Sequence, residues 1–136
     1  MSVTMKGKST GTTTVELQHE SGAIIVTTAP KDNGGDGSSF SPTDLCSVSL
    51  GACGTTIMSM FCKTKDINLE KIEFDITKEM SPAPRKIAKL TISYKIFSNC
   101  SEKEFSMIVN AGKTCPVRLT LSGNVEIVET YTQIKI

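Results

Sequence analysis

A long stretch without charge limits the folds that this chain can adopt. No Asp, Glu, Lys or Arg occurs between Asp44 and Lys63, and the interval is rich in Leu, Val, Ile, Met, Cys and Ala. Ser41 fits the N-cap of a helix, Pro42 its first position and Asp44 its third. About 20 residues at 1.5 Å each span ~30 Å, the width of a small domain. We therefore expect a buried central helix from about Pro42 to Lys63, apolar on most sides. Its expected apolar stripe consists of Leu45, Val48, Ala52, Ile57 and Phe61.

Strand-like segments flank this helix. Residues 12–19 and 23–28 are rich in Thr, Val and Ile around Ser21-Gly22, which is typical of a hairpin, and residues 2–8 are a further candidate strand. A Gly- and Ser-rich loop over residues 29–41 leads into the helix. Beyond the helix, residues 69–80 and 87–97 mostly alternate polar and apolar side chains around a Pro-containing turn.

The last third of the chain carries two more helix starts and a closing strand pattern. Ser101 and Glu104 form a capping box, and Pro116 after Cys115 can begin a short helical turn. Residues 124–136 have the pattern of one or two strands. This order of elements predicts an α+β fold in which an antiparallel sheet is wrapped against the long central helix.

Length and composition exclude several classes of protein. Residues 1–136 suit a single domain. The net charge of +1 and the absence of Trp argue against a nucleic-acid or membrane surface, and we expect no membrane-spanning segment and no signal peptide. The five cysteines form no Cys-x-x-Cys pair and accompany a single histidine, so we expect a reducing, cytoplasmic location, no structural disulfide and no metal site.

Cys53 lies between Gly51 and Gly54 in the helix. Each glycine costs about 0.5–1 kcal/mol relative to alanine. The missing side chains at these two positions leave space beside Cys53, either for a substrate or for the close crossing of another helix. Buried cysteines often act only as small hydrophobic residues, and we interpret Cys46, Cys62 and Cys100 in this way.

A disulfide partner for Cys53 must come from another element. Cys46 lies about 10 Å away along the helix, beyond the ~7 Å that a disulfide allows between Cα atoms. Cys62 points to the opposite side of the helix. Cys115 is the best candidate, because backbone N–H groups at a helix start lower a thiol pKa and because Arg118 adds positive charge nearby.

The segment FSPTDLCSVSLGACGTTIMSM, followed later by CPVRLTL, resembles the osmotically inducible protein C / organic hydroperoxide resistance (OsmC/Ohr) family. NGGDGSS and PAPRKIAKLTISYKI occur in the family's order. The resemblance implies an intertwined homodimer whose sheets wrap around central helices. It also implies a thiol peroxidase that reduces organic hydroperoxides or hydrogen peroxide without metal or bound cofactor.

The resemblance further assigns roles to individual residues. Cys53 becomes the peroxidatic thiol and Cys115 the resolving thiol, while Asp44 falls where the family commonly has a Glu that positions an active-site arginine. That arginine comes from the N-terminal half in the peroxidases, whereas this chain has only Arg85 and Arg118. Lys31 or Arg85 is a candidate replacement for stabilising the thiolate. The expected substrate-binding residues are Gly51, Gly54, Ile57, Met58 and Phe61. Each of the last three, taken singly, also fits a role in the hydrophobic core.

Three functions stay open from the sequence. The first is a peroxidase that uses a peroxide substrate and is regenerated by an external dithiol. The second is a thiol–disulfide oxidoreductase that uses the same two cysteines. The third is a non-catalytic homodimer that binds a small apolar ligand between its central helices. In each case the apolar helix predicts a permanent dimer, with an interface above about 2,000 Å².

Overall fold

The computed structural model describes all of residues 1–136 and divides the chain into two compact units. The N-terminal unit comprises Met1–Cys46 and the C-terminal unit comprises Ser47–Ile136. The boundary falls inside helix α1 (Pro42–Thr64), which is continuous across it. The sequence-based assignment of one domain over residues 1–136 stays a prediction.

The N-terminal unit contains a three-stranded antiparallel sheet in the order β1-β2-β3. Its strands are β1 (Met5–Ser9), β2 (Thr14–His19) and β3 (Ile24–Thr28). The hairpin around Ser21-Gly22 is confirmed, and Gly22 adopts a φ of 95°, which suits glycine. The loop that follows contains one short 3-10 helix, η1 (Lys31–Asn33).

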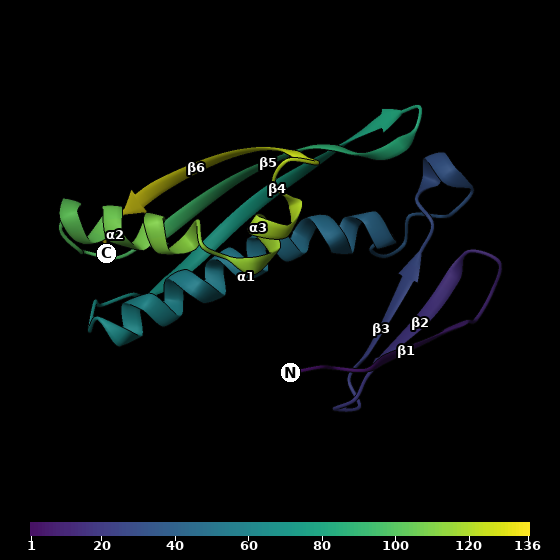
Figure 1. The fold of residues 1–136 in the computed structure, drawn as a ribbon, viewed down its shortest axis with the longest axis horizontal. Coiled ribbons are helices and arrows are strands. Elements are labelled where there is room, and N and C mark those ends of the chain that lie inside the picture. The colour runs from purple at the N-terminus through teal and green to yellow at the C-terminus, as the bar shows by residue number, and fades with distance from the viewer. The chain divides into compact units, whose positions relative to one another are not determined.

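The C-terminal unit contains a second sheet in the order β4-β5-β6 (Figure 1). The hairpin of β4 (Lys71–Pro82) and β5 (Arg85–Phe97) is antiparallel, as the alternation predicted. Strand β6 (Glu126–Ile134) runs parallel to β5, so the prediction of a purely antiparallel sheet is wrong. Two helices separate β5 from β6, and a connection of that length lets the chain return to the same end of the sheet.

Side-chain caps begin the two longer helices. At the start of α1 the Ser41 N–H donates to the Asp44 carboxylate at 2.9 Å, and the Asp44 N–H donates to the Ser41 hydroxyl at 3.1 Å. Helix α2 (Glu102–Gly112) begins with the predicted capping box of Ser101 and Glu104. The short helix α3 (Pro116–Leu121) follows Cys115 directly. The sequence therefore predicted all three helix starts correctly.

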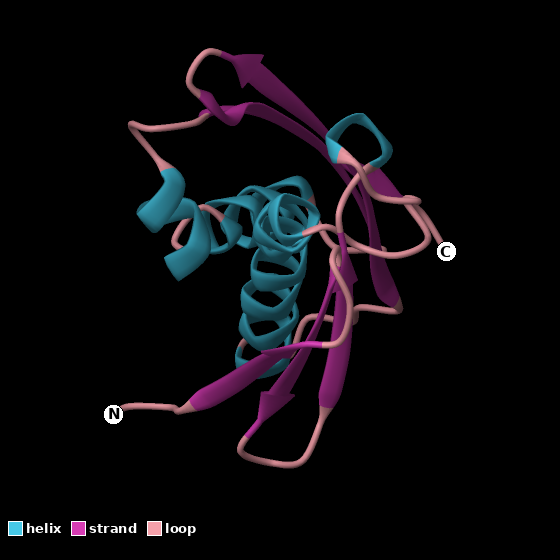
Figure 2. Ribbon diagram, turned by 90° about the vertical axis from the view of Figure 1, so that its right-hand side faces the viewer, coloured by secondary structure: helices cyan, strands magenta, loops and turns pink.

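Helices α1 and α2 cover one face of the second sheet (Figures 1 and 2). The buried stripe of α1 differs from the expected one, and Ala52 is exposed. The buried residues of α1 are Ser47, Leu50, Gly51, Gly54, Met58 and Cys62. A methyl group on Gly51 would overlap the ring of Phe74, and one on Gly54 would overlap the hydroxyl of Tyr94. Small residues face the sheet because two aromatic side chains fill the space beside them.

Helix α1 is not covered on all sides by its own chain. Met60 is 59% exposed, and only 33% of the most apolar stretch of the helix is buried. By length and composition α1 could cross a membrane, contrary to the expectation from the sequence that no segment approaches that limit. The core helix of a protein outside the membrane meets the same criteria, and α1 has six buried residues, of which Gly51 and Gly54 face the second sheet.

Candidate functional site: a pair of thiols and a partly buried ion pair

Cys53 on α1 and Cys115 at the start of α3 form the centre of the site, and we call them the thiol pair. Their side chains lie within hydrogen-bonding reach of each other. Cys115 is fully buried at 0% exposure, whereas Cys53 is partly exposed. The two sulfurs come from segments more than sixty residues apart in the sequence, yet they meet inside one unit, and both cysteines are free thiols.

The backbone of α3 holds the Cys115 sulfur. Cys115 is the N-cap of this helix, and its sulfur accepts a hydrogen bond from the Arg118 N–H at 3.3 Å. Burial raises the pKa of the Cys115 thiol, and the hydrogen bond with Cys53 raises the pKa further. The backbone N–H groups of Arg118 and Val117 act in the opposite direction. The raising effects outweigh the lowering ones, so the pKa of the Cys115 thiol lies above its usual value.

Arg118 interacts electrostatically with Cys115, although the expected cations were Lys31 and Arg85. The Arg118 guanidinium binds the carboxylate of Glu129 on β6 in a bidentate manner, with N···O distances of 2.7 Å and 3.1 Å to one oxygen and 3.2 Å to the other. The Glu129 side chain is only 11% exposed and that of Arg118 is 27% exposed. The carboxylate raises the pKa of Arg118, so the guanidinium stays charged.

Two stacked tyrosines connect this ion pair to α1. The Tyr131 hydroxyl donates to Glu129 at 3.0 Å, and the ring of Tyr131 stacks on Tyr94 with 5.0 Å between centroids. The Tyr94 hydroxyl donates to the Leu50 carbonyl of α1 at 3.4 Å. Burial raises the pKa of both phenols well above the usual range, so both remain protonated donors. The tyrosines therefore extend the polar network across the sheet to the helix of Cys53.

The other residues expected to stabilise or position charge lie elsewhere. Lys31 belongs to η1 of the N-terminal unit, where its aliphatic chain lies beside Gly37. Asp44 caps α1 through Ser41. Arg85 is the exposed first residue of β5 and pairs in register with Pro82. Roles for these three residues near the thiolate stay predictions.

The expected substrate-binding residues have packing partners in this unit. Phe74 and Tyr94 occupy the space beside the two glycines, which gives Gly51 and Gly54 a packing role against the sheet and not against another helix. Met58 is fully buried and lies against Gly112 of α2. Ile57 and Phe61 are partly buried and border the same core. Direct contact of any of the five with a substrate stays a prediction.

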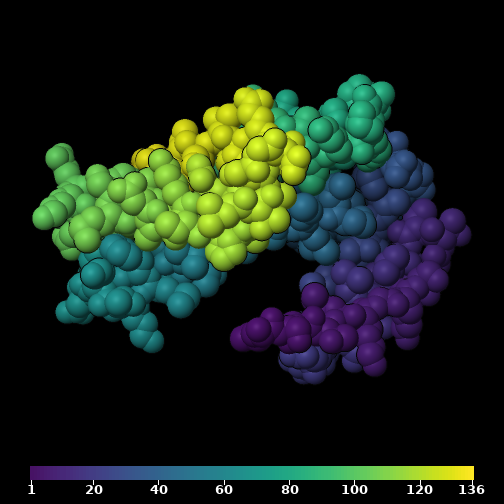
Figure 3. Space-filling model, viewed as in Figure 1, coloured from purple at the N-terminus to yellow at the C-terminus, as the bar shows by residue number.

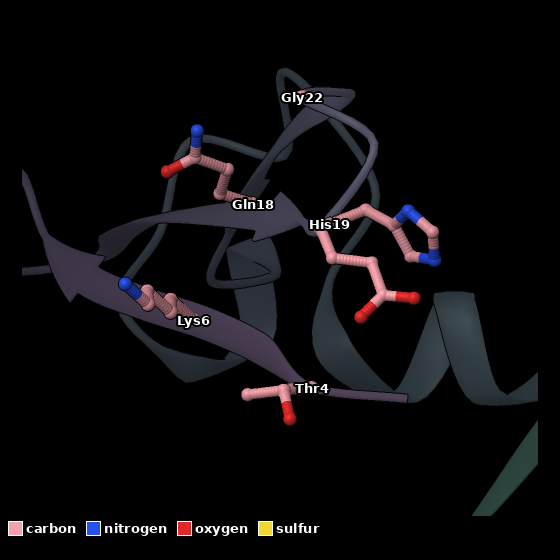
Figure 4. A pocket seen from close by; sticks show the side chains of 6 residues that line it. Thr4, Lys6, Gln18, His19 and Gly22 are labelled. Atoms are coloured by element: carbon pink, nitrogen blue, oxygen red, sulfur yellow. The ribbon is translucent and has the colours of Figure 1, made fainter. Parts of the chain in front are cut away.

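The remaining cysteines lie outside the thiol pair. Cys62 and Cys100 are buried in the core, and Cys46 is exposed near the start of α1. No cluster of three or more His, Cys, Asp or Glu side chains could hold a metal ion. Two open hollows lie on the sheet of the N-terminal unit. Figure 4 shows the one of about 270 Å³, which Lys6, Gln18 and His19 help to line and which contains no cysteine.

Sequence reasoning missed the role of Glu129, although β6 contains a signal for it. The register places Glu129 beside Ile92 and Tyr131 beside Tyr94, on the face of the sheet that the helices cover. Alternation along β6 gives that face Ile127, Glu129 and Tyr131. A carboxylate in an apolar series indicates a buried charge, and a buried charge requires a partner.

Comparison with known proteins connects this site to a family. The model of the OsmC-like protein family matches residues 35–130, which include both members of the thiol pair. The chain belongs to the OsmC-like family. The resemblance to OsmC/Ohr proteins seen in the sequence is thereby confirmed. No curated protein matches this chain in sequence.

Solved structures share the fold over nearly the whole chain. A protein of Psychrobacter arcticus 273-4, named for an osmotic stress induced and detoxification response, is 29% identical with a TM-score of 0.88 and 96% coverage of both chains. An OsmC-like protein of Mycoplasma pneumoniae is 20% identical, with a TM-score of 0.81 and 98% coverage of both. The organic hydroperoxide resistance protein OhrB of Bacillus subtilis is 16% identical, with a TM-score of 0.67, and the match covers 97% of this chain and 98% of OhrB. The α+β fold is therefore that of the OsmC-like proteins.

Proposed function

We propose that this OsmC-like protein is a thiol peroxidase that reduces organic hydroperoxides or hydrogen peroxide. The observation that carries the proposal is the close approach of the two thiols, one partly exposed and one buried. Such a pair provides a nucleophile and a resolving thiol in contact before any reaction. Structural relatives named as organic hydroperoxide resistance proteins add support through the shared fold.

The reaction has three steps. The Cys53 thiolate attacks the distal oxygen of the peroxide, the O–O bond breaks, and the sulfur becomes a sulfenic acid while the alcohol or water leaves after protonation. The Cys115 thiolate then attacks the sulfenic sulfur, which forms the disulfide and releases hydroxide. An external dithiol reduces the disulfide by exchange and is itself oxidised to a disulfide.

The partial exposure of Cys53 supports its role as the thiol that meets the substrate. Its closeness to Cys115 also supports the role of nucleophile, because a sulfenic acid formed on Cys53 would lie next to the thiol that resolves it. Cys115, with no exposed surface, suits a thiol that reacts only inside the protein. The five free cysteines fit a reducing compartment, and we place the protein in the cytoplasm.

We also propose that the protein works as a homodimer. Each unit leaves large apolar side chains exposed, and in the N-terminal unit these include Met5 and Ile25. Met60 of α1 and Leu119 of α3 are exposed in the C-terminal unit, and α3 forms part of its visible surface (Figure 3). A second copy of the chain would cover these apolar side chains in a permanent dimer interface.

Single-turnover kinetics with one equivalent of cumene hydroperoxide tests the peroxidase proposal. The unmodified protein is expected to lose two thiols, Cys115→Ser to lose one thiol and stop at the sulfenic acid, and Cys53→Ser to lose none rapidly. Cys46→Ser is the matched control, and it should behave as the unmodified protein does. Equal peroxide consumption by Cys53→Ser would falsify the proposal. Rapid exchange with an oxidised dithiol but none with peroxide would instead favour the thiol–disulfide oxidoreductase.

A further inference from the structure

The Arg118–Glu129 ion pair has no place in the three steps above, yet Arg118 lies three residues after the resolving thiol and interacts with it electrostatically. Arg118 is in the first turn of α3, and its own backbone N–H binds the Cys115 sulfur. Its guanidinium also approaches the carbonyl of Lys113, two residues before Cys115, at 3.5 Å. The side chain thus runs along the segment that carries the thiol, with its charge held by Glu129.

A guanidinium beside a thiol favours the thiolate, and a carboxylate bound to that guanidinium weakens the effect. Both charges are shielded from water, since Glu129 is nearly buried and Arg118 is mostly buried. Charges in such surroundings act over longer distances than they do in solvent. The bidentate contact therefore fixes the orientation of Arg118 and also limits how much its charge stabilises Cys115.

We propose that Arg118 is a positioning residue that favours the Cys115 thiolate for disulfide formation, and that Glu129 restrains this effect through the ion pair. The inference rests on the proposed function for the step that it serves. In that step the Cys115 thiolate supplies the electron pair of the new S–S bond and hydroxide leaves the sulfenic acid. A larger thiolate fraction accelerates the step at a given pH.

Cys115 also has neighbours on other elements. Cys53 on α1 donates to or accepts from it, and Tyr94 on β5 interacts with it electrostatically. Tyr131 on β6 shares Glu129 with Arg118. Lys113 lies 6.0 Å from the centroid of the Tyr131 ring. The tyrosines remain neutral over the range in which a thiol titrates, so Arg118, Glu129 and Lys113 are the charged side chains beside the Cys115 segment.

The test removes the positive charge of Arg118 or the negative charge of Glu129, which should shift the pKa of Cys115 in opposite directions. The titration midpoint of Cys115 is measured by ¹³Cβ NMR of labelled cysteine in a Cys53→Ser background, where the Cys115 signal is the one lost in Cys115→Ser. Arg118→Met should raise the midpoint by about one pH unit, and Glu129→Gln should lower it by a similar amount. Arg118→Lys keeps a positive charge, so its Cys115 midpoint should stay close to that of the protein with Arg118.

Matched controls separate charge from structure. Lys86→Met removes one positive charge from an exposed site of the same unit and should leave the midpoint unchanged. Glu129→Gln keeps an oxygen that can accept from Arg118, so it preserves the packing of the pair. Far-ultraviolet circular dichroism and thermal melting identify any variant that has unfolded. If Arg118→Met is unfolded, Glu129→Gln and Arg118→Lys still test the proposal.

The rate of disulfide formation provides the second measurement. After one equivalent of peroxide at a pH below the midpoint, Glu129→Gln should form the Cys53–Cys115 disulfide up to about tenfold faster, and Arg118→Met about tenfold more slowly. If both variants move the midpoint in the same direction, or neither moves it, the inference is wrong even when peroxide is reduced. If peroxide fails to oxidise Cys53 while the midpoints shift as stated, the proposed function is wrong and the electrostatic inference stands.

Discussion

Gly54 illustrates how one absent side chain sets the contact between a helix and a sheet. A methyl group there would overlap the Tyr94 hydroxyl, which itself donates to the Leu50 carbonyl one turn earlier in α1. Tyr94 is 2% exposed and stacks on Tyr131, so its ring has little room to move. The glycine thus lowers intrinsic helix stability and in exchange permits close packing beside the thiol pair.

We expect Gly54→Ala to destabilise the protein by about 1–2 kcal/mol, because overpacking outweighs the gain in helix propensity. Urea unfolding followed by circular dichroism measures the change. Tyr94→Phe removes the overlapping hydroxyl, so the same Gly54→Ala change should cost less in that background. A stabilised Gly54→Ala protein, or no coupling in the double-mutant cycle, would contradict this account of the glycine.

At the scale of elements, the start of α2 depends on a charged cap. The Glu104 carboxylate accepts from the Ser101 N–H at 3.0 Å, and the Ser101 hydroxyl accepts from the Glu104 N–H at 3.1 Å. The bond from the Ser101 N–H, and then the Ser101 side chain, lower the pKa of Glu104 below its usual value. The folded state therefore holds the ionised form of Glu104 more favourably than the unfolded chain does.

The lowered pKa predicts a pH dependence of stability. The contribution of Glu104 is fully present above the unfolded pKa of about 4.3 and is lost as the pH falls through the lower folded value. Urea midpoints measured between about pH 5 and pH 3 should fall less steeply for Glu104→Gln than for the unmodified protein. Glu102→Gln, in the same first turn, is the control and should keep the steeper fall. Parallel curves for all three proteins would show that the cap contributes nothing through its charge.

At the scale of the whole molecule, exposed apolar residues on both units predict assembly. Ile25 on β3 is 50% exposed, and Met60 on α1 is 59% exposed. Isolated apolar residues are common on protein surfaces, but here the exposed set also includes Met5, Ile24 and Val26 on the same small sheet. We expect a second chain to cover these strands.

We expect a homodimer by light scattering at micromolar concentration. Ile25→Glu should shift the protein toward monomer, because it places a carboxylate within the apolar contact. Thr91→Glu introduces the same charge on an exposed position of β5 and should leave the dimer intact. A monomeric unmodified protein, or equal loss of dimer in both variants, would contradict the predicted interface.

The sequence by itself determined the elements and their order. Caps at Ser41 and Ser101 and the proline at position 116 marked the three helix starts, and alternation marked the long hairpin, because these signals depend on neighbouring residues along the chain. The choice of Cys115 as the possible partner of Cys53 also came from local context, since the helix geometry excluded Cys46. These features are local, and local interactions are what a sequence pattern records.

Tertiary structure decided which of these elements meet. The parallel pairing of β6 with β5 depends on where the chain returns after α3, and no residue pattern in β6 specifies that direction. The pairing brings Glu129 to Arg118, so the cation beside the thiol pair is Arg118 and its partner comes from a strand. The same packing places Phe74 and Tyr94 over the glycines of α1. Contacts between distant segments depend on how the surfaces of the elements fit together, and only the folded chain determines that fit.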